Sequence, residues 1–425
     1  MRQDTEAANF RYFGEASQSV SEFMKRIYNR ISLALASLGP VFSVAMAVEL
    51  VLNPYESVDW GDTDHSKAQF HAHTTASDGS WNPHQVVDRY HDAGYRILAI
   101  TDHDTHSSQT SWPWTSFDDL VPSERSQTIM KTGEYRGQKS ALPTMAGDLE
   151  YENRDPVAMN MIAVEGNEIT RTYDGVHCHV LGLFSGWNSG EKDITDQLTG
   201  VSKAGGLAIL AHPAFSWTHR LTPGRRELEE GISDKFYRQY ATLFRDYPQL
   251  IAMEVAVGSG SPEAWPHDVD LWDRLLEEFM PERPIFGMAT DDFHSTQFGM
   301  GWAVFPQEIS DAADVRSAME NGAYYFSKVD YESMPVSAEL WKNIPVIRSI
   351  RHDEQAGILE IDAEVNGEPM EEGDCVWIGS QGEAIQTGLR LAYRDIAGVE
   401  NFGRAELQGP SGTTYTNPFG FVPAK

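Results

Sequence analysis

The hydrophobic pattern first becomes regular after about residue 67. Residues 68–73 and 96–103 are short apolar runs that predict two strands. Between them, Asn82-Pro83 is typical of a helix start, and apolar residues then recur at helical spacing as far as Gly94. The pattern therefore predicts a strand–helix–strand unit.

The same alternation of strands and helices continues down the chain. Apolar runs predict further strands at 161–170, 177–184, 207–211, 251–257, 285–290 and 301–305. Helical patterns lie between many of them, at 193–204, 236–244, 271–279 and 310–321, where Ser310 is the expected cap. Alternation of this kind indicates an α/β fold, either a barrel or a doubly wound sheet. Residues 106–158 are too long for an ordinary connection and predict an insertion over a site or a lid.

The hydrophobic pattern of the sequence changes from about residue 335. Short alternating runs separated by Gly, Asn and Asp replace the helical periods, at 346–350, 358–365, 375–378, 388–393 and 404–407. The segment 335–425 therefore predicts a small all-β domain, similar to a β-sandwich, with a structural role.

Residues 1–47 form an N-terminal extension with the features of a signal peptide or membrane anchor. Residues 31–48 carry no charge, follow Lys25, Arg26 and Arg30, and contain Ala45-Met-Ala47. A start at Met24 would give the extension a conventional basic beginning. Export to the periplasm or out of the cell is expected first. The alternatives are an anchor, with the rest of the chain outside the cytoplasm, or a buried helix.

The composition and charge of the chain limit the kinds of molecule that it is expected to bind. The formal charge is −30, with 63 acidic residues against 33 Lys and Arg. A field of this sign repels the phosphates of nucleic acid, so nucleic-acid roles lose weight. The two cysteines provide neither a disulfide framework nor a zinc motif. The sequence specifies no oligomeric state.

Histidines and carboxylates lie at the ends of the predicted strands. His71 and His73 are two residues apart, so both rings face one side of a strand, and Asp292 and His294 share a face in the same way. His177 and His179 also share a face, which leaves their roles interchangeable. Imidazole and carboxylate ligands suit Zn, Mn or Fe.

Six motifs in one order resemble the polymerase and histidinol phosphatase (PHP) superfamily. They read His71-Ala-His73, Thr-Asp102-His103, Gly-Asn-Glu168, His179-Val-Leu-Gly, Ala-His212-Pro and Asp292-Phe-His294, and the resemblance covers roughly residues 68–330. It implies a distorted (β/α)7 barrel similar to a TIM barrel over residues 48–334, followed by the small all-β domain.

The resemblance also implies two or three divalent metal ions. The first would be held by His71, His73, Glu168 and Asp292, the second by Glu168, His179 and His212, and the third by Asp78, His103 and His294. The family motif favours His179 over His177. Asp78 departs from the histidine that many members carry, which puts the third metal in question. Asp102 and Glu254 are candidate supporting carboxylates for the ligating histidines, and Arg171 and His106 are candidate substrate contacts.

These features predict a metal-dependent phosphoesterase that hydrolyses a small phosphomonoester through a metal-bound hydroxide. The alternatives are a phosphodiesterase or nucleotide phosphatase of the same superfamily, an amidohydrolase-type hydrolase, and a catalytically silent metal-binding module. Amidohydrolases usually bridge their metals with a lysine, and the predicted strands between 161 and 257 contain none. A silent module would normally lack ligands, and none is missing here.

The N-terminal extension gives the first testable prediction. If it is a signal peptide, cleavage after Ala47 should leave Val48 as the mature N-terminus. N-terminal sequencing of the native protein measures this. Recovery of an intact Met1 on soluble cytoplasmic protein would refute export.

Overall fold

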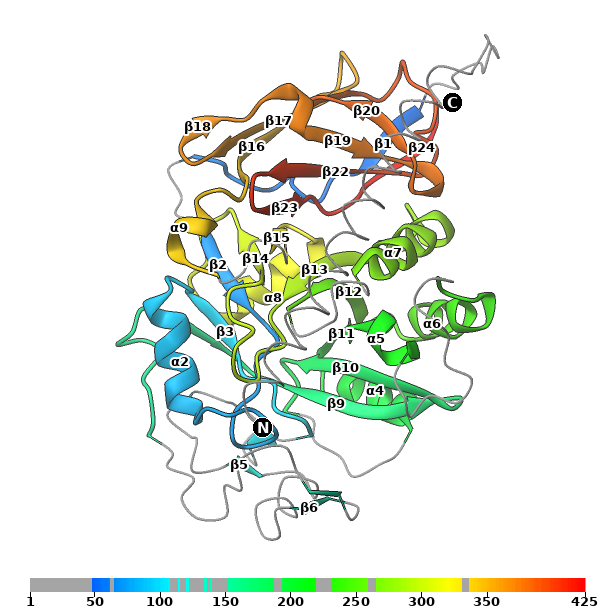
Figure 1. Cartoon of the computed structure of the whole chain (residues 1–425). Coiled ribbons are helices and arrows are strands. Elements are labelled where there is room, and N and C mark those ends of the chain that lie inside the picture. The colour runs from blue at the N-terminus through cyan, green and yellow to red at the C-terminus, as the bar shows by residue number, and fades with distance from the viewer. Residues whose placement is uncertain are drawn as a thin grey trace, which may run out of the picture. The chain divides into compact units, whose positions relative to one another are not determined.

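The computed structural model describes most of the chain after residue 47. The described residues are 48–61, 65–104, 106–107, 114, 120–121, 134–135, 138–139, 152–186, 193–218, 231–258, 265–330 and 336–424. The N-terminal extension, most of the 106–158 insertion and the side chain of His106 lie outside them. Within these ranges the protein has a mixed α/β fold (Figure 1). No helix in the described ranges is long and apolar enough to cross a membrane.

The predicted strand–helix–strand unit is confirmed. Strand β2 (Ser66–Gln69) runs parallel to β3 (Ile97–Ala99), and helix α2 (Pro83–Asp92) connects them. The amide of Asn82 donates to the side chain of Gln85 at 2.9 Å, which satisfies a backbone group at the helix start. Val86, Val87 and Tyr90 are buried, so the helical spacing does mark the inner face of α2.

A five-stranded sheet forms the middle of the chain. Its order is β13 (Phe286–Thr290), β12 (Leu250–Val257), β11 (Leu207–Ala211), β10 (Val176–Leu183) and β9 (Gly166–Tyr173). The β11–β12 and β12–β13 pairs are parallel, whereas β9, β10 and β11 are antiparallel. Four helices pack against these strands (Figure 1): α4 (Ile194–Lys203), α5 (Pro213–Thr218), α6 (Asp234–Asp246) and α7 (Trp265–Phe279). Both β11 and β13 are buried along their whole length, and only Thr290 at the end of β13 is polar.

Two predicted boundaries were wrong. Residues 161–170 are not one strand, because the segment is interrupted at Glu165. Strand β8 (Ile162–Val164) pairs with β3, whereas β9 pairs with β10. The helix α8 (Ala312–Asn321) is capped by Asp311 and not by Ser310. The Asp311 side chain accepts the amides of residues 313 and 314, at 2.8 and 3.0 Å.

An eleven-stranded sheet joins the start of the chain to its end. Its main path is β1 (Val48–Leu52), β24 (Phe419–Pro423), β22 (Phe402–Gly409), β23 (Gly412–Tyr415), β15 (Tyr325–Val329), β14 (Gly301–Phe305), β2, β3 and β8, with β19 (Cys375–Ile378) and β20 (Ala384–Thr387) beside β22. Because β15 pairs with β23, the C-terminal strands continue the sheet that carries β2. In Figure 1 the blue β1 lies beside the red β24. The domain division at residue 335 stays a prediction.

The remaining elements are small. A four-stranded sheet contains β16 (Val346–Asp353), β17 (Ile358–Val365), β18 (Glu368–Pro369) and β21 (Arg390–Ala392). Helix α9 (Ala338–Trp341) precedes it, and two 3-10 turns lie at Glu372–Asp374 and Ser380–Gly382. Within the insertion, β4 (His106–Ser107) pairs with β5 (Leu120–Val121), and β6 (Glu134–Tyr135) with β7 (Gln138–Lys139).

A buried ion pair connects strand β22, one of the C-terminal strands, to helix α7. The guanidinium of Arg404, on β22, donates to both carboxylate oxygens of Asp273 at 2.7 and 2.8 Å. Both residues are buried, so the Asp273 carboxylate depends on Arg404 for compensation, while Arg404 also pairs with Glu406. The amide side chain of Asn417 adds neutral links, accepting from Gly287 and donating to the carbonyls of Gly322 and Tyr324.

Candidate metal centre

The segment His71–His73 is held between two other chain segments. The amide of His73 donates to the carbonyl of Phe293 at 2.8 Å, and the amide of Thr101 donates to the carbonyl of Ala72 at 2.9 Å. Ala72 forms an isolated parallel bridge with Phe293. This extended conformation turns both imidazoles to one side, as the spacing predicts.

All nine predicted ligands converge in one cluster. They lie at or just beyond the ends of β2, β3, β11 and β13, in β9 and β10, and in the turn after β2. Every one is buried except His294, whose side chain is 30% exposed. The nine are His71, His73, Asp78, His103, Glu168, His179, His212, Asp292 and His294.

Four ligand atoms surround a first point in the cluster. The Nε2 atoms of His71 and His73 are 3.1 Å apart. They lie 3.1 and 3.0 Å from Oδ1 of Asp292, and 3.4 and 3.1 Å from Oε2 of Glu168. Ligand atoms around a tetrahedral ion with bonds of 2.0–2.1 Å would be about 3.3 Å apart. The observed spacing is therefore close to that of a metal's coordination sphere.

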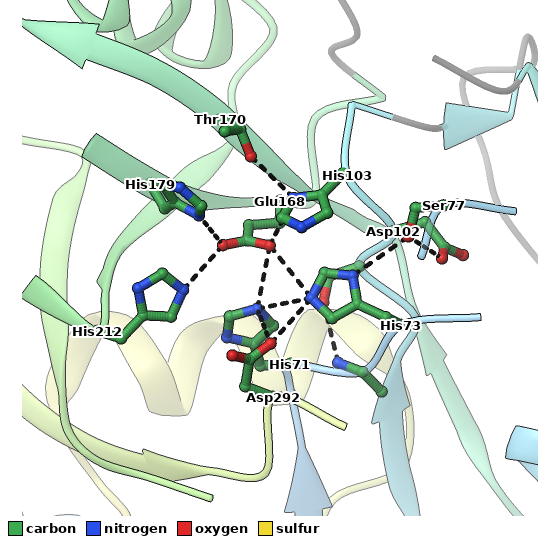
Figure 2. Close-up of polar contacts among 12 residues, drawn as sticks. His71, His73, Ser77, Asp102, His103, Glu168, Thr170, His179, His212 and Asp292 are labelled. Carbon is green, nitrogen blue, oxygen red and sulfur yellow. Dashed lines mark hydrogen bonds and ion pairs between the residues drawn. The ribbon is translucent and has the colours of Figure 1, made fainter. Parts of the chain in front are cut away.

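Glu168 joins this first group to a second. Its Oε1 atom lies 2.5 Å from Nδ1 of His179 and 3.0 Å from Nε2 of His212. Its Oε2 atom faces His71 and His73 instead. Figure 2 shows the carboxylate in the middle of the cluster with imidazoles on both sides. This is the placement that a bridging carboxylate requires, and the bridging role itself stays a prediction.

A third group forms around Asp78. Its two oxygens lie 3.3 Å from Nε2 of His103 and 3.3 Å from Nε2 of His294. Nδ1 of His73 is 3.7 Å away. His103 also approaches the centre, because its Nδ1 atom lies 2.9 Å from Oε2 of Glu168 and 2.8 Å from the hydroxyl of Thr170.

The chemistry of these donors fits divalent metal ions. Among the described residues, Oε2 of Glu168 and Nδ1 of His212 are buried atoms that make no well-aligned hydrogen bond, although imidazole nitrogens lie 2.9–3.4 Å from Oε2. A buried, unsatisfied carboxylate oxygen is costly unless a cation or donor meets it. Neutral imidazole nitrogens and carboxylate oxygens that face one another are electron-pair donors, and Zn, Mn or Fe would satisfy them together.

The electrostatics of the metal-free cluster favour added positive charge. Burial alone would raise the pKa of Glu168 and Asp292, but the neighbouring imidazoles outweigh it and hold each pKa well below its usual range. Burial would lower the pKa of His294, but the charge of Asp292 and the hydrogen bond to Asp78 outweigh it and raise that pKa to about 9. Despite burial, the carboxylates raise the pKa of His71, His103 and His212 as well, whereas burial lowers the pKa of His179 to about 4. Protons on the imidazoles with raised pKa values thus provide compensation that bound metal ions could replace.

Glu254 lies where a supporting carboxylate is expected. Its Oε1 atom is 2.7 Å from Nδ1 of His71 and accepts the hydroxyl of Thr290 at 2.7 Å. Its Oε2 atom accepts the backbone amide of His212 at 2.8 Å. One buried carboxylate therefore fixes a ring of the first group and the backbone of the second.

Asp102 contacts Ser77, which lies beside His73, whereas the prediction was a direct contact with a ligating histidine. It accepts the amide and hydroxyl of Thr74 and the hydroxyl of Ser77, at 2.6–2.7 Å, and Ser77 in turn lies 3.3 Å from Nδ1 of His73. Asp102 therefore orders the turn that presents Asp78. Gly79 closes this turn, since a Cβ there would lie 2.5 Å from the carbonyl oxygen of His73.

The other candidate contacts differ in position. Arg171 is directed at the loop after His103, donating to Asp104 and to the carbonyl of Thr170, both at 2.6 Å. His177 lies beside His179, with ring nitrogens 3.1 and 3.3 Å from its Nε2 atom, while His179 is the one that meets Glu168. The substrate role of Arg171 stays a prediction.

Sequence reasoning missed the hydroxyl groups that support the ligands. Ser77, Thr170 and Thr290 contact His73, His103 and Glu254, respectively. No sequence signal could have found them, because Ser and Thr are common near strand ends and only the folded arrangement selects these three.

The chain was compared with known proteins. No protein-family model matches it, and no curated protein matches it. A two-domain protein containing a predicted PHP-like metal-dependent phosphoesterase from Bacteroides vulgatus ATCC 8482 is 14% identical, over 87% of this chain and 98% of its own, with a TM-score of 0.41. A putative metal-dependent phosphoesterase from Bifidobacterium adolescentis ATCC 15703 is 16% identical, over 60% of this chain and 96% of its own, with a TM-score of 0.33.

A third solved structure is the lesion-specific endonuclease PfuEndoQ from Pyrococcus furiosus. It is 11% identical, over 60% of this chain and 56% of its own, with a TM-score of 0.34. All three TM-scores are low, so what is proposed below rests on the geometry of the cluster.

The central position of Glu168 gives a prediction about metal content. Glu168→Gln removes the charge that two groups of ligands share, so most of the bound metal should be lost. His294→Ala is the matched control, because His294 lies at the edge of the third group and should cost that metal alone. Elemental analysis per folded chain, with folding checked by circular dichroism, measures both. Equal metal loss in the two variants would contradict the bridging role.

The raised pKa of His294 gives a prediction about protons. At pH 7 an imidazole with a pKa of about 9 is protonated, whereas a ligating imidazole must be neutral. Metal binding at pH 7 should therefore release protons, and metal affinity should rise with pH up to about 9. Calorimetry in buffers of different ionisation enthalpy measures the release, which should decrease in His294→Ala. A binding heat that is the same in all buffers would contradict it.

Proposed function

We propose that this protein is a metal-dependent phosphoesterase of the PHP superfamily that hydrolyses a small phosphomonoester. The observation that carries the proposal is the position of Glu168, whose two oxygens face two different sets of histidines within one buried cluster. A single carboxylate between two sets of nitrogen ligands is what a site with two or three divalent ions needs.

The side chains of the cluster would hold the metals and orient the ester. Bound divalent metals lower the pKa of a coordinated water and neutralise the charge of a phosphate. His71, His73 and Asp292 fix one side of this arrangement, and Glu254 holds the ring of His71 in one orientation. The burial of the ligands excludes bulk water, which strengthens electrostatic interactions with the phosphate.

We also propose that the fold is a distorted (β/α)7 barrel followed by a small all-β domain. Two isolated bridges support the barrel, His103 with Glu168 and Ala72 with Phe293. If these bridges join the two sheets, the strands would follow one another in a ring, in the order β2, β3, β9, β10, β11, β12 and β13. The ligands lie at one end of this ring, where barrel enzymes place their active sites.

Two alternatives are weaker. An amidohydrolase-type enzyme would use a lysine between the metals, and Glu168 has that place here. A silent metal-binding module would keep the cluster without turnover. The acidic surface favours a small substrate over nucleic acid, and the features of residues 1–47 support export as the location.

Metal dependence is the test of the enzyme. Purified protein should contain more than one transition-metal equivalent per chain, chelation should abolish hydrolysis of phosphomonoesters, and Mn or Zn should restore it. Parallel assays with matched monoesters and diesters separate a monoesterase from a diesterase. Full activity in the presence of chelator would refute the mechanism, and metal without hydrolysis of any phosphoester would favour the silent module.

A further inference from the structure

Phe215 lies beside the cluster in the short helix α5. This helix begins directly after His212, at Pro213. Pro213, Ala214, Ser216 and Trp217 are buried and Thr218 is half-buried, whereas Phe215 is 41% exposed. The fold therefore places one aromatic side chain at the surface, three residues beyond a predicted metal ligand.

The ring of Phe215 is in contact with that ligand. Its centroid lies 5.6 Å from the centroid of His212, with the two planes at 88°. The His212 ring is itself stacked on His71 at 5.5 Å, and its Nε2 atom is 3.0 Å from Glu168. The imidazole of His212 therefore contacts both Phe215 and the carboxylate at the centre of the cluster.

The position of Phe215 is more informative than its exposure. Among the described residues, the exposed large hydrophobic side chains are Val51, Val157 and Phe215. Single exposed apolar residues are ordinary, but Phe215 is the one of these three that contacts the cluster. The other accessible part of the cluster is polar, with the side chain of His294 30% exposed and that of Asp78 12% exposed.

A phosphomonoester has two chemically different ends. The phosphate carries the negative charge and belongs at the ligand cluster, where bound metals would neutralise it. The alcohol part must then lie at the rim of the cluster. An aromatic ring at that rim would contact an apolar planar group through offset-stacked or edge-to-face packing.

We propose that Phe215 packs against a ring in the alcohol part of the substrate, so that the substrates are phosphate esters of alcohols that carry an uncharged planar ring. This inference rests on the proposed phosphoesterase function and names its substrate class. The formal charge of −30 adds a reason for the ring to carry no negative charge, since a second anionic group would be repelled.

The test compares esters that differ in the ring alone. Benzyl, cyclohexylmethyl and ethyl phosphate have alkoxide leaving groups of similar basicity, and cyclohexylmethyl matches benzyl in size without a planar π face. The metal-loaded enzyme should prefer benzyl phosphate. Phe215→Ala should lower kcat/KM for benzyl phosphate about tenfold and change that for ethyl phosphate by less than about twofold.

Two further variants separate the ring from general effects. Phe215→Trp keeps an aromatic face and should retain the preference for benzyl phosphate. Val51→Ala, an exposed apolar position in β1, should change neither ester. An equal loss for all three esters in Phe215→Ala, or no loss for any of them, would overturn the inference.

Binding provides a readout that does not need turnover. Benzylphosphonate and ethylphosphonate are not hydrolysed, and calorimetry with metal-loaded protein measures their affinities. Tighter binding of benzylphosphonate that is lost in Phe215→Ala supports the role of Phe215 even if no ester is hydrolysed, an outcome that would refute only the enzyme. Equal affinities of the two phosphonates for the wild-type protein, or no binding of either, would overturn the role of Phe215.

Discussion

The burial of the Glu168 carboxylate is the constraint on which the rest of the site depends. A carboxylate that is fully removed from water must be compensated by positive charge, and five imidazoles surround this one at 2.5–3.4 Å. The five are His71, His73, His103, His179 and His212. Protons on His71, His103 and His212, whose pKa values are raised by the neighbouring carboxylates despite burial, can supply part of that charge, but a protonated imidazole cannot act as a ligand. The arrangement is therefore suited to exchanging protons for metal ions.

The ligands are held by a strained backbone and by supporting carboxylates. His212 and Asp292 have positive φ angles of 27° and 46°, conformations that cost about 1–3 kcal/mol each in a residue with a side chain. Glu254 accepts the backbone amide of His212, and Asp291 accepts three amides from residues 299–301, so the chain on both sides of the strain is fixed. These contacts hold the ligand atoms near coordination distances from one another.

The C-terminal strands contribute to the site through the sheet that they extend. Strand β2, which leads to His71, pairs with β14, then β15, and then β23. The buried pair of Arg404 and Asp273 holds α7 to the same strands, and α7 packs against β12, which carries Glu254. A change in the C-terminal strands can therefore affect the cluster through hydrogen-bonded neighbouring strands. The nine predicted ligands of the cluster all lie at or before residue 294.

The sequence by itself determined the local features. Periods of a few residues can be read directly from the chain. They give the common face of His71 and His73, the buried face of α2 and the succession of strands and helices along the chain. The motif order also singled out the nine residues that the structure brings together. Tertiary structure alone decided the pairing of β1 with β24, the break between β8 and β9, the partners of Asp102 and the exposure of Phe215. Each of these features depends on contacts between segments far apart in the chain, or on which surfaces other elements cover. A local sequence pattern cannot predict such contacts.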